Sequence, residues 1–134
     1  MKPDAIIDEA RDWIGTPFVH QGTCKGVGAD CLGFVYGVAK GLGLVDCALP
    51  AYSREPTGDK LERGISEYLD RVRDLRVGDV MVFKFAKYAQ HVGVYTGDTV
   101  IHSYSTVGRV VEHRMDDIWR RRHVATFRFR GLDV

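Results

Sequence analysis

A thiol and two imidazoles in this sequence have the types and setting that nucleophilic catalysis requires. Cys31 follows Asp30 at the start of an apolar run, DCLGFVYGVAKG. His91 and His102 lie in two short β-branched runs, HVGVYT and TVIHSY. A thiol, an imidazole base and a group that orients the base make up the generalised nucleophilic triad. These residues could attack a carbonyl carbon, provided that the fold brings them together.

The run that begins at Cys31 is expected to form a helix with Asp30 as its N-cap and its end at Gly41 or Gly43. In the first turn of a helix, unpaired N–H groups and the macrodipole favour a thiolate. The same N–H groups can stabilise an oxyanion. The alternative is that Cys31 is a small buried apolar residue, as most free cysteines are.

The two histidines are predicted to share one face of a β-hairpin. Gly97 and Asp98 make a two-residue turn with glycine first, as a type II′ turn prefers. This turn pairs Thr96 with Thr99 and places His102 opposite Gly93. His91 and His102 are then diagonal neighbours with Cα atoms roughly 7–8 Å apart.

Glycines are expected to let the helix approach this hairpin. Gly33, Gly37 and Gly41 recur at every fourth position, so they form one bare helix face. Gly93 leaves a gap between the two histidines on the predicted face of the hairpin. We therefore expect the bare helix face to pack against the sheet and to bring the thiol to the imidazoles.

Within the predicted site, His91 is the candidate base and His102 the candidate orienting group. The sequence has no asparagine, so a Cys-His-Asn triad is excluded. Weaker candidates for the third place are Gln21, Gln90, Asp98 and Glu112. Two alternatives stay open: each histidine bonds a backbone carbonyl in a half-buried strand, or the three residues form a zinc centre.

The remaining patterns predict an α+β fold in one domain, residues 1–134. Helices are expected over residues 3–14, with Ile6, Ile7, Ala10 and Ile14 on one face, and over residues 59–73. About five strands are expected in an antiparallel sheet, over residues 79–85, 91–96, 99–104, 109–113 and 124–129.

Composition bounds the class of protein. The 134 residues carry a formal net charge of +1, which does not favour a nucleic-acid partner. No run approaches the roughly 20 apolar residues that span a bilayer, and the first residues do not read as a signal peptide. We expect synthesis in the cytoplasm and no cofactor. The three cysteines, an odd number, do not suggest a disulfide framework.

The segments GTPFVHQG, GADCLGFV, GDVMVF and QHVGVYTGDTVIHSY, in this order, resemble the NlpC-type cell-wall cysteine peptidases. The resemblance covers the chain from about Ile14 to the end. It implies a reduced papain-like fold, in which the nucleophile helix packs on a C-terminal antiparallel sheet. It also implies a catalytic triad of Cys31, His91 and His102. The implied substrate is the peptidoglycan stem peptide, commonly at the bond from γ-D-glutamate to diaminopimelate.

The form D-C-L-G and the segment from Trp119 to Arg122 (W-R-R-R) are similar to the branch found in tails of phages and gene transfer agents. This resemblance implies tail-tip or hub proteins as partners. It implies a chain that is carried on a virion-like tail and acts in the periplasm or cell wall. Two alternatives to a hydrolase are a weakly active or non-catalytic tail component, and an acyltransferase or amidase that uses the same site.

One position departs from the family pattern. The family's G-x-P-Y tyrosine, whose hydroxyl contributes to the site, is Phe18 here. Loss of one transition-state donor costs about 10²–10³ in rate, and His20 or Tyr36 could replace it. Phe18, His20 and Asp30 are the expected substrate-binding residues, and the Asp30 carboxylate could hold a cationic amine of the substrate.

Overall fold

The computed structural model describes residues 1–54 and 56–132. Its helices are α1 (Pro3–Asp12), α2 (Cys31–Gly41), α3 (Lys60–Ile65) and α4 (Asp117–Arg122). Its strands are β1 (Thr23–Cys24), β2 (Gly28–Ala29), β3 (Leu69–Val72), β4 (Val80–Phe85), β5 (Tyr88–Tyr95), β6 (Thr99–Tyr104), β7 (Arg109–Arg114) and β8 (His123–Phe129). None of the helices in these described ranges has the length and hydropathy of a membrane span.

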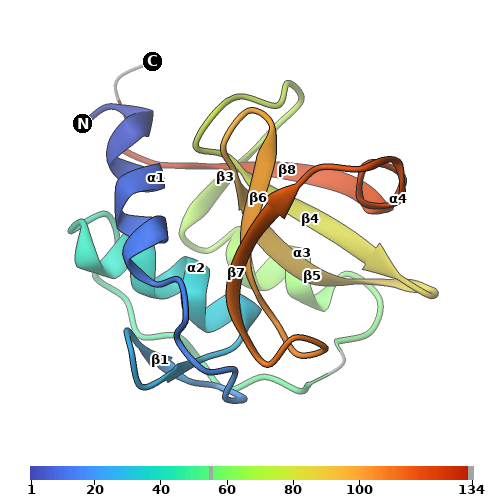
Figure 1. Cartoon of the computed structure of the whole chain (residues 1–134), viewed down its shortest axis with the longest axis horizontal. Helices are drawn as coiled ribbons and strands as arrows, with labels where there is room; N and C mark the ends of the chain where they lie inside the picture. The colour runs from blue at the N-terminus through green and yellow to red at the C-terminus, as the bar shows by residue number, and fades with distance from the viewer. Residues whose placement is uncertain (55, 133–134) are drawn as a thin grey trace.

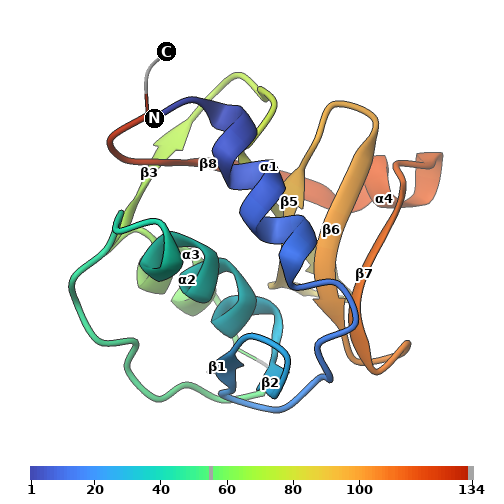
Figure 2. The ribbon, with the colours of Figure 1, turned by 60° about the vertical axis from the view of Figure 1, so that its left-hand side comes forward.

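A six-stranded antiparallel sheet forms the centre of the fold, in the order β3-β8-β4-β5-β6-β7. Helices α1, α2 and α3 gather on one side of it, and α4 lies on the other side (Figures 1 and 2). The predicted α+β fold, with N-terminal helices on a C-terminal antiparallel sheet, is confirmed. The five expected strands are present with ends shifted by at most three residues, and β3 is an additional edge strand.

The two faces of the sheet bury different clusters of side chains. Val80 and Val82 of β4 belong to the large core beneath α1, α2 and α3. Met81 and Phe83, which alternate with them, pack in a smaller cluster that includes Trp119 of α4. Alternation with period two therefore gives this strand two buried faces.

Helix α1 is shorter than expected and turns a different residue into the core. It ends at Asp12, and Trp13, its C-cap residue, is buried. Ile14 is 47% exposed, because the chain has left the helix before this position. The expectation that Ile14 continues the apolar face is therefore wrong, whereas Ile6, Ile7 and Ala10 are buried as expected.

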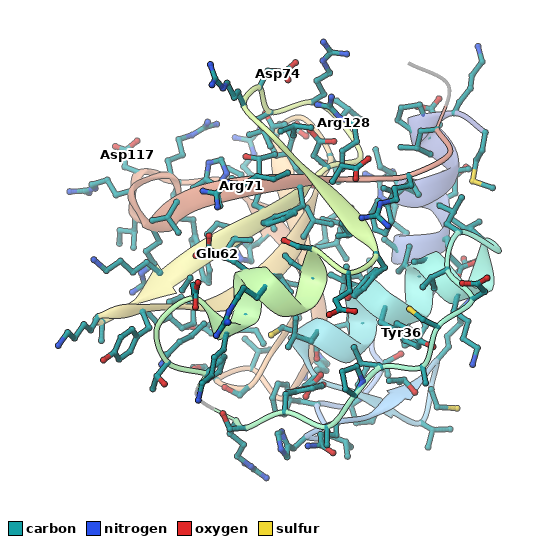
Figure 3. All side chains as sticks on the ribbon, turned by 180° about the vertical axis from the view of Figure 1, so that it is seen from behind. Tyr36, Glu62, Arg71, Asp74, Asp117 and Arg128 are labelled. Carbon is teal, nitrogen blue, oxygen red and sulfur yellow. The ribbon has the colours of Figure 1, made fainter. Side chains whose placement is uncertain are left out.

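The helix expected over residues 59–73 is wrong beyond Ile65. Residues Leu69–Val72 form β3 instead, which pairs with β8 from Leu69–Phe129 to Val72–Thr126. Both structures bury Leu61, Ile65 and Leu69, so the apolar spacing does not distinguish them. The neighbouring β8 decides, because it offers a free edge to which β3 can bond. Arg71 of β3 also bonds back to Glu62 of α3 at 2.9 Å (Figure 3).

A buried ion pair stabilises the sheet near the end of β8. Arg128 donates to both carboxylate oxygens of Asp79, each at 2.8 Å. The Asp79 side chain is 1% exposed and that of Arg128 15%. Such a bidentate pair satisfies the carboxylate in a site from which water is largely excluded.

Candidate active site

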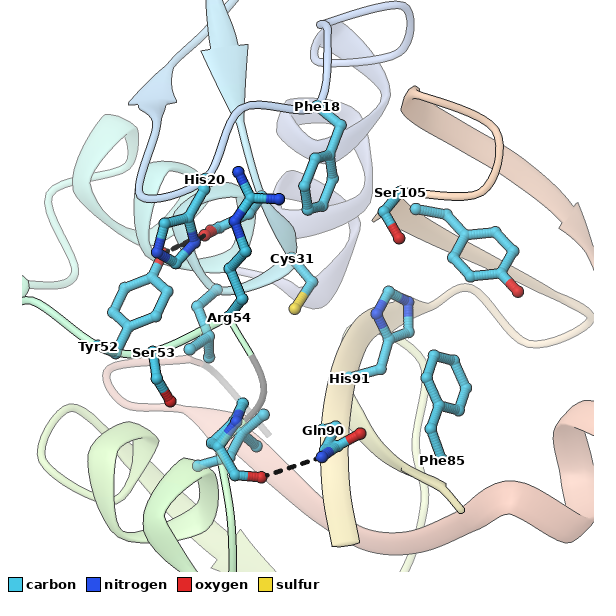
Figure 4. A pocket seen from close by; sticks show the side chains of 15 residues that line it. Phe18, His20, Cys31, Tyr52, Ser53, Arg54, Phe85, Gln90, His91 and Ser105 are labelled. Carbon is cyan, nitrogen blue, oxygen red and sulfur yellow. Dashed lines mark hydrogen bonds and ion pairs between the residues drawn. The ribbon is translucent and has the colours of Figure 1, made fainter.

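Cys31 is the first residue of α2, as predicted. The Asp30 side chain accepts a hydrogen bond from the Gly33 N–H at 2.8 Å, so Asp30 is the helix N-cap. The thiol opens into a pocket of about 240 Å³ that His91 also lines. Figure 4 shows the Cys31 side chain and the His91 imidazole at the wall of this same pocket. The structure therefore brings together the thiol and the candidate base.

The expected thiolate is not supported. Burial, followed by the neighbouring Asp30 carboxylate, raises the pKa of the Cys31 thiol to about 12. Backbone N–H groups, including that of Leu32 in the first turn, lower the pKa but do not outweigh these two effects. Although Cys31 keeps partial exposure at the pocket, protein encloses the sulfur on most sides. The same carboxylate that caps the helix therefore opposes ionisation of the thiol, which rests protonated.

The predicted hairpin register is confirmed. Tyr95 pairs with Val100, and Gly97 has a positive φ of 117°, which favours glycine at this turn. His91 and His102 are both buried, at 5% and 0% exposure. Nε2 of His91 lies 2.5 Å from Nδ1 of His102, so the two rings share a hydrogen bond. The ring nitrogen of His91 that is left for the thiol is Nδ1.

Burial keeps both imidazoles neutral. Burial, with His113 and Arg122 as further causes, lowers the pKa of His91 to about 3. Burial, with His91 and His113 as further causes, lowers the pKa of His102 to about 2. A protonated thiol and a neutral imidazole therefore face each other in the resting site.

Aromatic side chains enclose the two histidines. Phe85 stacks on His91 with ring centroids 5.1 Å apart, and Tyr104 stacks on His102 at 5.2 Å. Trp119 of α4 packs edge-on against His102 at 5.0 Å. These contacts fix the ring planes and explain why the imidazoles are desolvated.

Helix α2 is held over the separation of two strands. β5 and β6 pair at Val94–Ile101 and Tyr95–Val100, next to the turn. Farther from the turn, β5 continues its pairing with β4, and β6 continues its pairing with β7. Ser103 of β6 donates to the backbone carbonyl of Ala29 at 2.7 Å, two residues before the thiol. This bond ties the start of α2 to the strand that carries His102.

The glycines bring elements together, but the predicted partners are wrong. A Cβ on Gly33 would lie 1.8 Å from the Gly22 carbonyl oxygen, and one on Gly37 would lie 2.3 Å from Trp13. The bare face of α2 therefore packs on α1 and the preceding loop, not on the sheet. A Cβ on Gly93 would lie 2.6 Å from the Val100 side chain and 3.1 Å from the Cβ of His102. Gly93 thus makes room for these two residues of β6 instead of for the helix.

His113, which the sequence analysis did not single out, extends the pair to three imidazoles. Its Nε2 lies 2.8 Å from Nε2 of His102. The strand register could have predicted it, because His113 of β7 pairs with Val100 of β6 and is therefore diagonal to His102. The weaker candidates for the third place bond elsewhere: Glu112 to Arg11, for example, and Gln90 to the Pro56 carbonyl.

The Asp30 carboxylate collects further polar groups at the pocket wall. It accepts hydrogen bonds from the Tyr52 hydroxyl, at 2.5 Å, and from the Gln21 N–H, at 2.7 Å. Nδ1 of His20 lies 3.6 Å from it. Burial and the Asp30 carboxylate raise the pKa of Tyr52, so its hydroxyl stays a donor. Tyr52 lies in a loop without periodic pattern, and no sequence signal marked it.

Phe18 lines the pocket with His20 and Asp30, so all three expected substrate-binding residues surround the thiol (Figure 4). Tyr36 does not replace the missing hydroxyl, because it donates to the Cys47 carbonyl at 2.6 Å, outside the residues that line this pocket. Tyr52 brings a hydroxyl to the pocket from a different segment, where it donates to Asp30.

The zinc alternative does not fit this geometry. In the described part of the chain, no three His, Cys, Asp or Glu side chains are grouped as metal ligands. Nε2 of His91 and Nδ1 of His102 point at each other, so they do not converge on a shared ion.

Comparison with known proteins identifies a family and two relatives. The model of the NlpC/P60 family matches residues 15–128. The murein DD-endopeptidase MepS/murein LD-carboxypeptidase of Escherichia coli K12 is 25% identical over 119 residues, which are 88% of this chain and 58% of that protein. The γ-D-glutamyl-L-lysine dipeptidyl-peptidase of Bacillus subtilis is 31% identical over 80% of this chain and 33% of that protein. This chain thus spans little more than half, or a third, of these relatives.

Solved structures share the fold. An NlpC/P60 family protein from Bacillus cereus matches with a TM-score of 0.72 and 24% identity, over 96% of this chain and 40% of that chain. The NlpC/p60 domain of the peptidoglycan hydrolase SagA matches with a TM-score of 0.66 and 20% identity, over 94% and 97%. RipD from Mycobacterium tuberculosis, described as a non-catalytic NlpC/p60 domain protein adapted to peptidoglycan binding, matches with a TM-score of 0.61 and 19% identity, over 97% of each chain.

Proposed function

This chain belongs to the NlpC/P60 family, and from that premise we propose that it is a cysteine peptidase that hydrolyses peptidoglycan stem peptides. The observation that carries the proposal is the alignment of three side chains. Cys31, at the start of a helix, shares a pocket with His91, and His91 is hydrogen-bonded to His102. This is the order of nucleophile, base and orienting group that acyl transfer requires.

The mechanism starts from a neutral pair. As the Cys31 sulfur attacks the amide carbonyl, its proton passes to Nδ1 of His91 and a carbon–sulfur bond forms. His91 then gives that proton to the leaving nitrogen, and the carbon–nitrogen bond breaks. Water adds to the acyl-enzyme, its proton passing to His91, and the thiol is regenerated as the acid product leaves. The N–H of Cys31 supports the oxyanion.

Desolvation makes the proton transfer concerted with attack. A free thiolate is disfavoured by burial and by Asp30, and a free imidazolium by burial and nearby charges. When substrate is bound, the Cys31 thiolate need not form before attack. Negative charge develops on the carbonyl oxygen while His91 takes the proton.

The finer substrate assignment is the bond that follows γ-D-glutamate, with diaminopimelate as the next residue. Its support is the relative from Bacillus subtilis, whose name specifies a γ-D-glutamyl-L-lysine dipeptidyl-peptidase. The buried Asp30 carboxylate beside the thiol supports a substrate with a cationic amine near the scissile bond. Phe18 and His20 line the same pocket and would contact the neighbouring part of the peptide.

Delivery on a phage-like or gene-transfer-agent tail is a separate proposal. It rests on the similarity of the form D-C-L-G and of the W-R-R-R segment to that branch. In the structure this segment lies in α4, where Trp119 covers the histidines and Arg122 lies 5.0 Å over Phe85. Mass spectrometry of purified tail particles from cells that express the chain would test this: its absence from the particles would contradict delivery.

A non-catalytic role has one observation in its favour. RipD shares the fold and is described as non-catalytic. Here, however, thiol and both imidazoles are in place, which favours activity. A transferase or amidase would use the same three groups. The products identify a transferase, because attack by an amine acceptor leaves a new amide, whereas water leaves a carboxylate; an amidase is identified by the amide bond that water cleaves.

Mass spectrometry of muropeptides tests the function and the bond together. Purified peptidoglycan is incubated with the wild type, with Cys31→Ala and with Cys24→Ala, the matched control at an exposed thiol. We expect new stem-peptide fragments with the wild type and the control, and none with Cys31→Ala. Digestion by Cys31→Ala at the wild-type rate would overturn the proposed mechanism. Amide-linked products would identify a transferase.

A further inference from the structure

Three imidazoles form a continuous chain behind the thiol, one from each of three neighbouring strands. His91 of β5 contacts His102 of β6 at 2.5 Å, and His102 contacts His113 of β7 at 2.8 Å. The chain ends on the backbone: Nδ1 of His113 lies 2.9 Å from the Arg114 carbonyl oxygen.

The hydrogen bond to this carbonyl determines which ring nitrogen of each imidazole carries the hydrogen. A carbonyl oxygen only accepts hydrogen bonds, so Nδ1 of His113 carries a hydrogen. A neutral imidazole has one N–H, and Nε2 of His113 is therefore an acceptor. His102 must then donate from Nε2 and accept at Nδ1, and His91 donates from Nε2. Nδ1 of His91 is left with a lone pair.

We propose that His113 is a positioning residue that fixes the tautomers of His102 and His91 through this chain, so that His91 presents a lone pair to Cys31. The inference rests on the proposed function, because it concerns the base of that site. Its consequence is that the base is ready before substrate binds.

The opposite set of tautomers would disable the site. If His102 donated from Nδ1, His91 would accept at Nε2 and carry its hydrogen on Nδ1, where it could not take the thiol proton. Ring rotation is also restricted: Trp119 packs against His102 at 5.0 Å and against His113 at 5.3 Å. The Arg114 carbonyl therefore selects one of the two possible sets of tautomers, and the packing of Trp119 keeps the rings in that arrangement.

Nitrogen NMR of the wild-type protein tests the tautomers without any substrate. Chemical shifts distinguish a protonated from an unprotonated ring nitrogen. We expect hydrogens on Nε2 of His91, on Nε2 of His102 and on Nδ1 of His113. A hydrogen on Nδ1 of His91 in the resting protein would overturn the proposal.

Two substitutions at His113 separate hydrogen bonding from packing. His113→Phe keeps a ring beside Trp119 but removes the acceptor, and we expect kcat to fall about tenfold while KM is unchanged. His113→Gln keeps a carbonyl acceptor for His102 and should retain most of kcat. His123→Phe is the matched control, because His123 is also half-buried but bonds to Thr126 outside the chain of imidazoles.

The outcomes distinguish this proposal from the proposed function. A wild-type kcat in His113→Phe, with the His91 tautomer unchanged, would overturn the positioning role. Equal losses in both His113 variants would show a packing effect and would also overturn it. If the tautomers are as expected but the protein cleaves no muropeptide, the proposed peptidase function is contradicted, whereas the proposed tautomers of the three histidines are supported.

Discussion

The raised pKa of Cys31 makes a prediction that runs against the usual behaviour of a catalytic cysteine. Iodoacetamide reacts with thiolates, so a thiol with a pKa of about 12 is alkylated slowly. The exposed thiols of Cys24 and Cys47 serve as internal references in the same molecule. We expect both to be alkylated before Cys31 at pH 8, although Cys31 is the candidate nucleophile.

The size of the effect follows from the thiolate fraction. At pH 8 a thiol with an ordinary pKa of about 8.5 is roughly a quarter ionised, whereas one with a pKa of about 12 is ionised to about one part in 10⁴. The more basic thiolate is the better nucleophile and recovers a factor of about 40. We therefore expect Cys31 to react about 10²-fold more slowly than an ordinary exposed thiol.

Asp30→Asn tests the second cause of the shift. The asparagine oxygen can still accept the N–H of Gly33 and cap the helix, but the charge beside the sulfur is gone. The pKa of Cys31 should fall, and each unit of fall should speed its alkylation about three- to fourfold.

Peptide mass spectrometry over a time course gives the rate at each cysteine. Rates at Cys24 and Cys47 should not change in Asp30→Asn. Fastest alkylation at Cys31 in the wild type would refute the reasoning from burial and charge, and would restore the helix N-terminus as the dominant effect. An unchanged Cys31 rate in Asp30→Asn would remove the carboxylate as a cause.

Three further predictions concern stability and are checked by chemical unfolding. Gly37→Ala would place a Cβ 2.3 Å from Trp13, so we expect a loss of about 1–3 kcal/mol; Gly64→Ala, which meets no atom within 4 Å, is the control. His91 and His102 have lowered pKa values, so the unfolded state binds more protons below the ordinary pKa of 6.5. Stability should therefore fall as the pH drops from about 6.5 toward 3, by up to about 1.4 kcal/mol per unit for each histidine, and a flat profile would contradict their burial in neutral form. Asp79→Ala removes the buried half of the bidentate pair, leaves Arg128 with Asp74 as its remaining partner and should cost about 3–5 kcal/mol; a loss below 1 kcal/mol would show that Asp74 or solvent replaces the pair.

Local rules predicted the parts of the site that depend on neighbours in the sequence. Asp30 caps α2 because an N-cap needs only an acceptor three residues before the N–H that it satisfies. The two-residue turn at Gly97 sets the register of β5 and β6, which places His91 beside His102. Both inferences depend on short stretches of chain, and both are confirmed.

Distant contacts decided where the local patterns were ambiguous. The apolar spacing of residues 59–73 suits a helix, yet Leu69–Val72 form a strand because β8 offers an edge for pairing. The glycines of α2 indicated a close approach, but only the packed structure shows that Trp13 and Gly22 are the partners. Tyr52 reaches Asp30 across 22 residues, from a loop that no pattern marks.

The sequence alone determined the identity of the candidate nucleophile: Cys31 has a capped helix start, and the hairpin pairs two histidines on one face. The tertiary structure decided its chemical state. A helix terminus is a local feature, and it favours a thiolate wherever solvent allows it. Burial and the charges around the sulfur are sums over segments far apart in sequence, and here they reverse that preference and leave a neutral thiol facing a neutral imidazole.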